Sequence, residues 1–212
     1  MAGRKRKFSG MDIVTALALV AVVLAAVILL FDPGEQPQPR QRISVRALEQ
    51  LAVPEDVDVR LITVDGHSRR GTDLTELRSI VIHYVGNPGT TAEENWRWYE
   101  DPNSNVSSHF LVGLEGEVIQ CLPLHEMSSA TSQRNVDTIS IEVCHPDDTG
   151  DFNRKTYKSL VKLTAWLVRE CGLEVSDVIR HHDATGKECP RYYVRNEDAW
   201  LAFLEDVEAG IR

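Results

Sequence analysis

The chain has 212 residues, of which 42% are hydrophobic and 7% aromatic, so it can bury one domain core of ordinary size. Its formal net charge is −9, and its first 31 residues hold four of the 23 basic residues but only one of the 32 acidic ones, so the remainder is more acidic still. An acidic body lacks the basic footprint that a phosphate backbone requires, which argues against a nucleic-acid partner.

An uncharged, strongly apolar stretch at residues 13–31 is long enough to cross a hydrocarbon core of about 30 Å. The basic run Arg4–Lys7 precedes it, so the positive-inside rule predicts that residues 1–12 stay in the cytoplasm. A cleaved signal peptide is the alternative, but the stretch exceeds the usual apolar length of about 7–15 residues, and no clean small-x-small site precedes Asp32. We therefore expect an uncleaved transmembrane anchor, a cell-membrane location and an extracytoplasmic domain.

Residues 32–42 carry three prolines and no hydrophobic cluster, which predicts an extended linker. Residues 43–212 are then expected to form one domain. Its first part, residues 43–78, has little periodicity apart from one short helix predicted near residues 45–51.

Residues 80–85, Ile-Val-Ile-His-Tyr-Val, predict a short buried strand with His83 near its end. Taken alone, His83 fits a core histidine better than a ligand. Periodicity and turn residues predict the following further elements: a helix over 91–99, a hairpin of strands 106–114 and 117–122 turning at Glu115-Gly116, a strand over 139–143, a helix from about 154 to 171, a strand over 177–180 and a helix over 197–207.

The strand at residues 139–143 alternates between apolar and polar side chains, so Ile139, Ile141 and Val143 share one face and Glu142 lies on the other. Two interpretations follow. The polar face is either exposed to solvent, or it lines a cleft in which Glu142 accepts a proton from a reacting water.

The segment from His181 to Cys189 contains half of a possible zinc site. The turn-forming residues Asp183 and Gly186 favour a loop that folds back and aims both side chains at one ion. A catalytic zinc site needs three protein ligands and an open position, and His83 is the best candidate for the missing ligand.

The cysteines do not predict a disulfide framework, because none is close to another in the sequence. One of the four, Cys189, is a metal-ligand candidate. Outside the cytoplasm the others can form disulfides, and the sequence leaves their pairing open. They are Cys121, Cys144 and Cys171.

The chain resembles the zinc-dependent N-acetylmuramoyl-L-alanine amidases, the family shared by phage lysozyme-like amidases and peptidoglycan recognition proteins. Four motifs carry the resemblance: Ile80–Tyr84; Ser108-His109-Phe110 with Gly113 and Gly116; Asn135 before Ile139–Glu142; and His181–Pro190. The resemblance implies an α/β fold in which a central mixed β-sheet is flanked by helices. It also implies peptidoglycan as the substrate, cleaved between N-acetylmuramic acid and L-alanine.

The resemblance implies a Zn²⁺ ion held by His83, His181 and Cys189, whereas His182 is not a ligand. Glu142 corresponds to the general base, and Lys187 to the lysine that stabilises the oxyanion. Some family members instead carry a tyrosine at the position of Ser108, a departure that strengthens the case for Glu142.

Substrate contacts transfer less completely. Asn135 matches a family asparagine and Arg134 lies beside it, so both are candidate substrate-binding residues, with ordinary loop positions as the alternative. Residues 127–130, Met-Ser-Ser-Ala, replace a Trp-His-Ala-Gly run of many relatives, so contacts made there do not carry over.

Two other classes of protein remain. A recognition module would bind peptidoglycan without cleaving it, but such members commonly lack the cysteine ligand that Cys189 supplies. A membrane-bound structural protein with incidental histidines would bind no metal.

Overall fold

The computed structural model describes residues 41–64 and 67–212. The predicted cytoplasmic segment, the predicted anchor at residues 13–31 and nearly all of the predicted linker lie outside the described residues. Within the described part, no helix combines the length and the apolar character needed to span a membrane. All the elements described below belong to one compact unit over residues 40–212.

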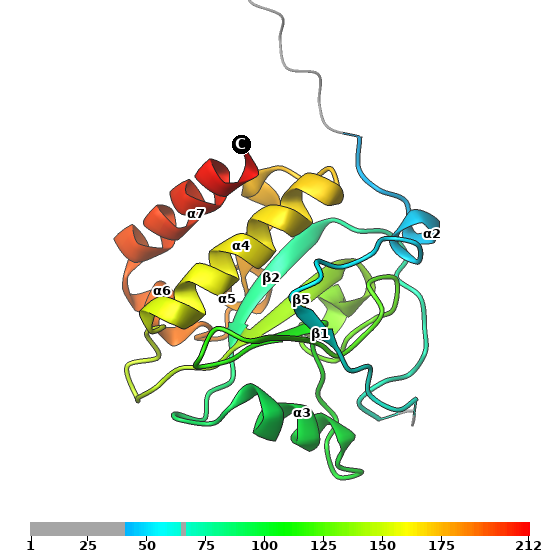
Figure 1. Ribbon diagram of the computed structural model, residues 1–212, viewed down its shortest axis with the longest axis horizontal. Helices are drawn as coiled ribbons and strands as arrows, with labels where there is room; N and C mark the ends of the chain where they lie inside the picture. The colour runs from blue at the N-terminus through cyan, green and yellow to red at the C-terminus, as the bar shows by residue number, and fades with distance from the viewer. Residues whose placement is uncertain (1–40, 65–66) are drawn as a thin grey trace, which may run out of the picture. The chain divides into compact units, whose positions relative to one another are not determined.

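A six-stranded sheet forms the centre of the domain (Figure 1). Its strands in spatial order are β1 (Val57–Val59), β4 (Val118–Gln120), β3 (Phe110–Val112), β5 (Thr138–Val143), β2 (Ser79–Tyr84) and β6 (Val178–Arg180). Only the β3–β4 pair is antiparallel, so the predicted mixed sheet is confirmed. The long central strands β2 and β5 pair in parallel over six residues each, which makes them the frame of the domain.

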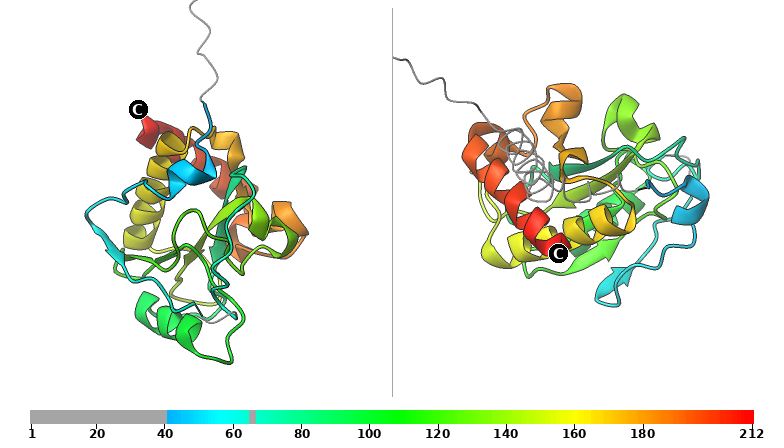
Figure 2. Two further views of the ribbon diagram at one scale, coloured as in Figure 1. Left: turned by 90° about the vertical axis from the view of Figure 1, so that its right-hand side faces the viewer. Right: turned by 90° about the horizontal axis from the view of Figure 1, so that it is seen from above.

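Helices α4 (Arg154–Glu170) and α7 (Glu197–Ile211) lie side by side on one face of the sheet (Figures 1 and 2). Asn153 caps α4 by accepting hydrogen bonds from two backbone amides of its first turn, and Gly172 follows its end with φ +64°. The helix predicted from about 154 to 171 is confirmed, and its apolar side chains Leu160 and Leu167 are fully buried against the sheet. Burying this stripe gives α4 its position.

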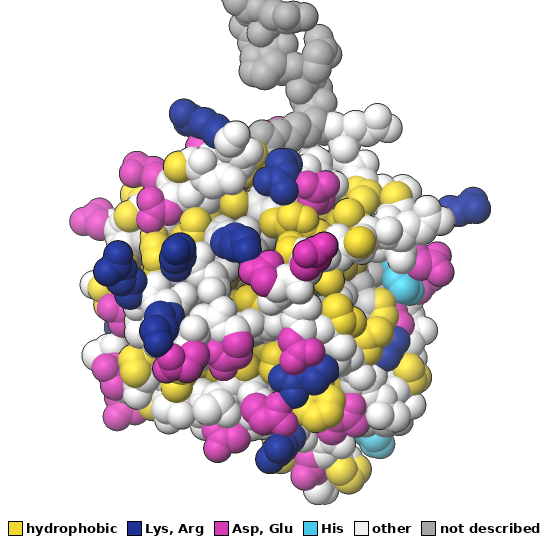
Figure 3. Space-filling view, in the orientation of Figure 1, with side chains coloured by type: hydrophobic (Ala, Val, Ile, Leu, Met, Phe, Trp, Pro, Cys, Tyr) yellow, Lys and Arg dark blue, Asp and Glu magenta, His cyan; other side chains and the backbone are white. Residues whose placement is uncertain are grey.

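The outer surface seen in Figure 3 mixes acidic and basic side chains with hydrophobic atoms between them. Local ion pairs account for part of this pattern. Lys162 on α4, for example, lies 2.5 Å from Asp56, and both side chains are largely exposed. Exposed pairs of this kind contribute little to stability.

Helix α3 (Ala92–Glu100) covers the opposite face. It begins in a capping box, in which the Thr91 side chain accepts from the Glu94 amide and the Glu94 carboxylate accepts from the Thr91 amide. Ala92 and Tyr99 pack against the β3 and β4 side chains of a second, smaller core. The helix predicted at residues 91–99 is therefore confirmed with a shift of one residue.

The predicted hairpin is present but shorter than expected, because only the three residues of β3 and of β4 pair. Gly116 adopts φ +86° in its turn, and a Cβ there would lie 2.9 Å from the Ser159 hydroxyl, so glycine is required. The segment predicted to be irregular contains α2 (Val45–Leu48), as expected, and the edge strand β1. Three residues are too few for a sequence pattern to reveal that strand.

The segment after β6 was predicted as a loop that folds back, but it begins with the short helix α5 (His181–Thr185). The Asp183 carboxylate accepts the Arg180 backbone amide at 2.8 Å and starts the helical turn, and Gly186 ends it with φ +80°. The chain continues through α6 (Arg191–Arg195) into α7. Asp183 therefore acts as a turn-stabilising residue.

Candidate metal and catalytic site

His83 and Glu142 are neighbours on the two central strands, each at the penultimate position of its strand. Alternation sends Ile82 and Ile141 into the core beneath α4, so His83 and Glu142 face the α3 side of the sheet. The His83 Nδ1 atom lies 3.8 Å from Glu142 Oε1. Parallel pairing without a register shift thus places a candidate ligand beside the candidate base.

His181 and Cys189 reach the same place from the neighbouring strand. β6 pairs with β2 so that Arg180 stands opposite Ile82, and His181 follows at once, with its ring centroid 4.5 Å from that of His83. A hydrogen bond from the His182 amide to the Cys189 carbonyl, 2.9 Å long, closes the segment.

The three predicted ligands form one cluster. The metal-binding atoms of His83, His181 and Cys189 lie within 4.8 Å of one another, and all three residues are buried. They come from the end of β2, the start of α5 and the loop that follows it. The structure therefore brings together residues as far apart in the sequence as His83 and Cys189, which are separated by 106 positions.

The donor atoms of this cluster fit a zinc ion. Nδ1 of His181 is buried with no hydrogen-bond partner, and Nε2 of His83 lies 3.2 Å from the Thr131 hydroxyl, which leaves Nδ1 of His83 for a ligand. Burial lowers the pKa of His181 to about 4 and lowers that of His83 well below its usual value, so both imidazoles keep a lone pair. Two neutral imidazoles and a cysteine sulfur are a typical zinc donor set.

The Cys189 thiol fits this set only as a thiolate. Burial, together with the nearby Glu142 carboxyl, raises the pKa of Cys189 to about 12 in the absence of a cation. A coordinated cation deprotonates a thiol outright, so metal binding and loss of the thiol proton are coupled.

Glu142 does not lie on a solvent-exposed sheet face. Its side chain is 19% exposed, and its Oε2 atom is buried without a hydrogen-bond partner. Burial raises the pKa of Glu142 to about 8, and the charge of Lys187 opposes the shift. A buried, unpaired carboxyl oxygen costs stability, which is typical of a group retained for chemistry.

A cavity of about 350 Å³ opens over the cluster and extends toward α3. His181, Cys189, Glu142 and Lys187 all line it, whereas His83 lies in the sheet behind them. The remaining lining residues are Tyr84, Val85, Gly86, Asn87, Asn95, Trp98, Tyr99, Val106, Ser107, Ser129 and Ala130. A substrate in this cavity meets the candidate ligands, base and lysine together.

Arg134 and Asn135 are not among the residues that line the cavity. Asn135 Oδ1 accepts the backbone amide of Thr131 at 2.6 Å, and the Arg134 side chain donates to Asp137 at 2.8 Å and to the Ser79 hydroxyl at 3.1 Å. Asn135 therefore holds the residue whose hydroxyl contacts His83. Contact of either residue with substrate stays a prediction.

Two contributors to the site were not predicted. Thr131, 48 residues further along the chain, contacts His83 from the position just before the 3-10 helix η1 (Ser132–Val136). Tyr99 reaches the cavity from α3, and its hydroxyl lies 3.1 Å from Ser108 Oγ. Ser108 in turn donates to the Phe110 carbonyl at 2.8 Å. No local motif marks either residue, because both contacts depend on how the elements pack.

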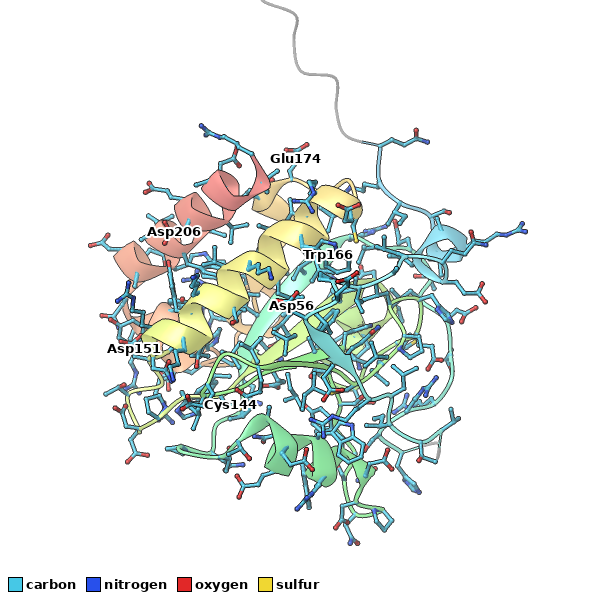
Figure 4. The ribbon with its side chains drawn as sticks, in the orientation of Figure 1. Asp56, Cys144, Asp151, Trp166, Glu174 and Asp206 are labelled. Carbon is cyan, nitrogen blue, oxygen red and sulfur yellow. The ribbon has the colours of Figure 1, made fainter. Side chains whose placement is uncertain are left out.

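The other cysteines lie outside the ligand cluster. Cys121, Cys144 and Cys171 are buried, and each is a free thiol in the described structure. Figure 4 marks Cys144, which follows β5 directly in the sequence. Burial is the largest cause of the raised pKa of the Cys144 and Cys171 thiols, which makes both poor nucleophiles.

Comparison with known proteins agrees with this geometry. Residues 73–192 match the N-acetylmuramoyl-L-alanine amidase family, more than half of the chain, so the chain belongs to that family. Two similar relatives come from Bacillus subtilis strain 168. The amidase XlyA is 30% identical over 159 residues, covering 70% of this chain and 50% of XlyA, and the amidase BlyA is 28% identical over 169 residues, covering 70% of this chain and 46% of BlyA.

The structure of the catalytic domain of XlyA superimposes with a TM-score of 0.63 at 29% identity, covering 71% of this chain and 98% of that domain. The chain spans about half the length of the curated relatives it matches. For XlyA the likeness concerns the catalytic domain. The family match over residues 73–192 includes His83, His181 and Cys189.

Proposed function

We propose that this protein is a zinc-dependent N-acetylmuramoyl-L-alanine amidase that hydrolyses peptidoglycan between N-acetylmuramic acid and L-alanine. One observation carries the proposal. The buried donors of His83, His181 and Cys189 converge beside the unpaired carboxyl of Glu142 at an open cavity, in a chain of the amidase family.

His83, His181 and Cys189 would hold the zinc ion. Bound there, zinc would supply a Lewis acid for the amide carbonyl and would make the attacking water more acidic. The Thr131 hydroxyl contacts Nε2 of His83 and so orients its ring. Asn135 in turn positions Thr131 by accepting its backbone amide.

Glu142 takes a proton from the attacking water and delivers it to the nitrogen of the departing L-alanine, so that the C–N bond breaks and a neutral amine leaves. The raised pKa of its carboxyl in the metal-free site suits the second step, because a protonated carboxyl can donate to the nitrogen. The first step needs the ionised carboxylate, which a cation held beside it at His83 would favour. Lys187, at the cavity wall, places a positive charge where negative charge develops on the carbonyl oxygen.

The reaction is tested by digesting purified peptidoglycan with the full chain and analysing the products by mass spectrometry. We expect stem peptides that begin with a free L-alanine amino group and glycan strands with unsubstituted lactyl groups. A metal chelator should stop their release. Tight binding to peptidoglycan without either product would identify a recognition module instead.

We further propose that residues 13–31 anchor the protein in the cell membrane and that the amidase domain lies on the extracytoplasmic side. The proposal rests on the apolar stretch and on the basic residues Arg4–Lys7 before it. Protease added to intact protoplasts should then degrade the domain while a cytoplasmic marker protein survives. If the domain is cut only after the protoplasts are lysed, the assignment is wrong.

A further inference from the structure

Trp98 presents a large apolar surface at the cavity. Its neighbour Tyr99 packs in the small core and also borders the cavity, but it is buried. Trp98 is 49% exposed and lines the cavity together with Val106, which is 46% exposed. Few other large apolar side chains of the described chain are as exposed. Exposed apolar groups gathered beside a cavity indicate a contact surface for a ligand.

The cavity has two chemically different ends. Among its described lining residues, only Glu142 and Lys187 carry a charge, and both lie near the ligand cluster, where the Lys187 charge acts on His181 and on Glu142. Toward α3 the wall is neutral. There Asn87, Asn95 and the hydroxyl-bearing Ser107 line the cavity together with Trp98.

We infer that the α3 end of the cavity is a subsite for an uncharged N-acetylated sugar ring of the substrate, and that Trp98 is its specificity-determining residue. This inference rests on the proposed function. A pyranose ring presents C–H groups on its face and hydroxyl and acetamido groups at its edge, which match an aromatic face bordered by neutral amides and hydroxyls. A stem peptide carries ionised carboxylates, and burying these without a charged partner is costly.

The size of the cavity agrees with this occupant. Its volume of about 350 Å³ lies at the lower end of the range of about 300–1,000 Å³ that is usual for small-ligand sites. The ligand cluster must accommodate the scissile amide, so the α3 end is left for one neighbouring group of the substrate. Trp98 then sets which side of the amide faces α3.

Binding of a peptide-free disaccharide, N-acetylglucosamine linked to N-acetylmuramic acid, tests the subsite. The full chain is titrated into the disaccharide while broadening of the acetamido methyl NMR signals is followed. We expect Trp98→Ala to weaken binding about ten-fold or more, the usual effect of removing an aromatic anchor, and Trp98→Phe to restore most of the affinity. With peptidoglycan as the substrate, kcat/KM should fall by a similar factor in Trp98→Ala.

Trp166 provides the matched control. It lies on α4 (Figure 4), where it lines a different surface groove with Val161 and Lys158. Trp166→Ala should leave both disaccharide binding and kcat/KM as in the wild type. Thermal unfolding of each variant shows that the domain is folded under the conditions of the titration.

The possible failures of the subsite and of the amidase function are distinguishable. Unchanged disaccharide binding in Trp98→Ala, while the wild type cleaves peptidoglycan, overturns the subsite and leaves the amidase intact. Trp98-dependent binding of the free stem peptide in place of the disaccharide overturns it too. In the converse case Trp98→Ala loses disaccharide binding, and the wild type does not cleave peptidoglycan. That result supports the subsite and contradicts the proposed amidase reaction.

Discussion

Replacing Cys189 with alanine is expected to remove zinc from the protein and to abolish release of stem peptides from peptidoglycan. His83 and His181 remain after the change, and two neutral imidazoles lack the thiolate that completes the donor set. Metal analysis should find about one zinc ion per wild-type chain, because a catalytic zinc site uses three protein ligands for one ion. The variant should contain almost none.

Unfolding measurements separate this loss of metal from a loss of fold. A metal present at about 1,000 times its dissociation constant stabilises a folded protein by about 4 kcal/mol, so a chelator should lower the unfolding temperature of the wild type. The same chelator should not change that of Cys189→Ala.

Cys171→Ala is the matched control, because it removes another buried thiol that packs at the end of α4 and is not part of the cluster. It should be less stable than the wild type and still bind zinc. A Cys189→Ala protein that keeps its full zinc content would contradict the assigned ligand set.

Replacing Glu142 with glutamine is expected to leave the fold and the zinc content unchanged and to lower turnover by about 10²-fold or more. Glutamine has nearly the same shape but cannot accept the proton of the attacking water. Because burial raises the pKa of Glu142, the native site bears the cost of keeping an ionisable group there. The variant removes that cost, which is present only above the unfolded-state pKa of a glutamate. At neutral pH its free energy of unfolding should therefore equal or exceed that of the wild type when both are metal-free.

Lys187→Ala serves as the comparison for Glu142→Gln. It should also lower kcat while zinc is retained, because a charge that stabilises the oxyanion is lost. The Lys187 side chain is exposed at the cavity, so the free energy of unfolding should change little when it is removed. For each variant, metal analysis measures the zinc content, calorimetry measures the stability, and digestion of peptidoglycan measures the turnover. Near wild-type turnover in a zinc-loaded Glu142→Gln protein would refute the proposed role of the carboxyl, even with the amidase reaction intact.

The candidate ligands and the candidate base could be located in the sequence because each lies in a short segment with its own pattern. The buried strand around His83, the alternation around Glu142 and the compact segment from His181 to Cys189 are all set by neighbours a few residues away. Helices α3, α4 and α7 were predictable for the same reason, because capping residues and apolar stripes are local signals.

The helical turn of α5 was mistaken for a loop because its cause is a side chain that also favours loops. Asp183 accepts hydrogen bonds equally well in an open turn and at the start of a helix, and only its contact with Arg180 decides between them. The edge strand β1 was missed because its pairing partner, β4, lies some 60 residues further along the chain.

The sequence by itself determined which residues are able to bind zinc and move a proton, because these abilities belong to the side chains. The tertiary structure decided where they meet: the parallel register of β2 and β5 set His83 beside Glu142, and β6 brought His181 next to them. It alone placed Thr131 behind His83 and Trp98 at the cavity. Strand order, register and helix docking depend on contacts between distant segments, and no local pattern encodes those contacts.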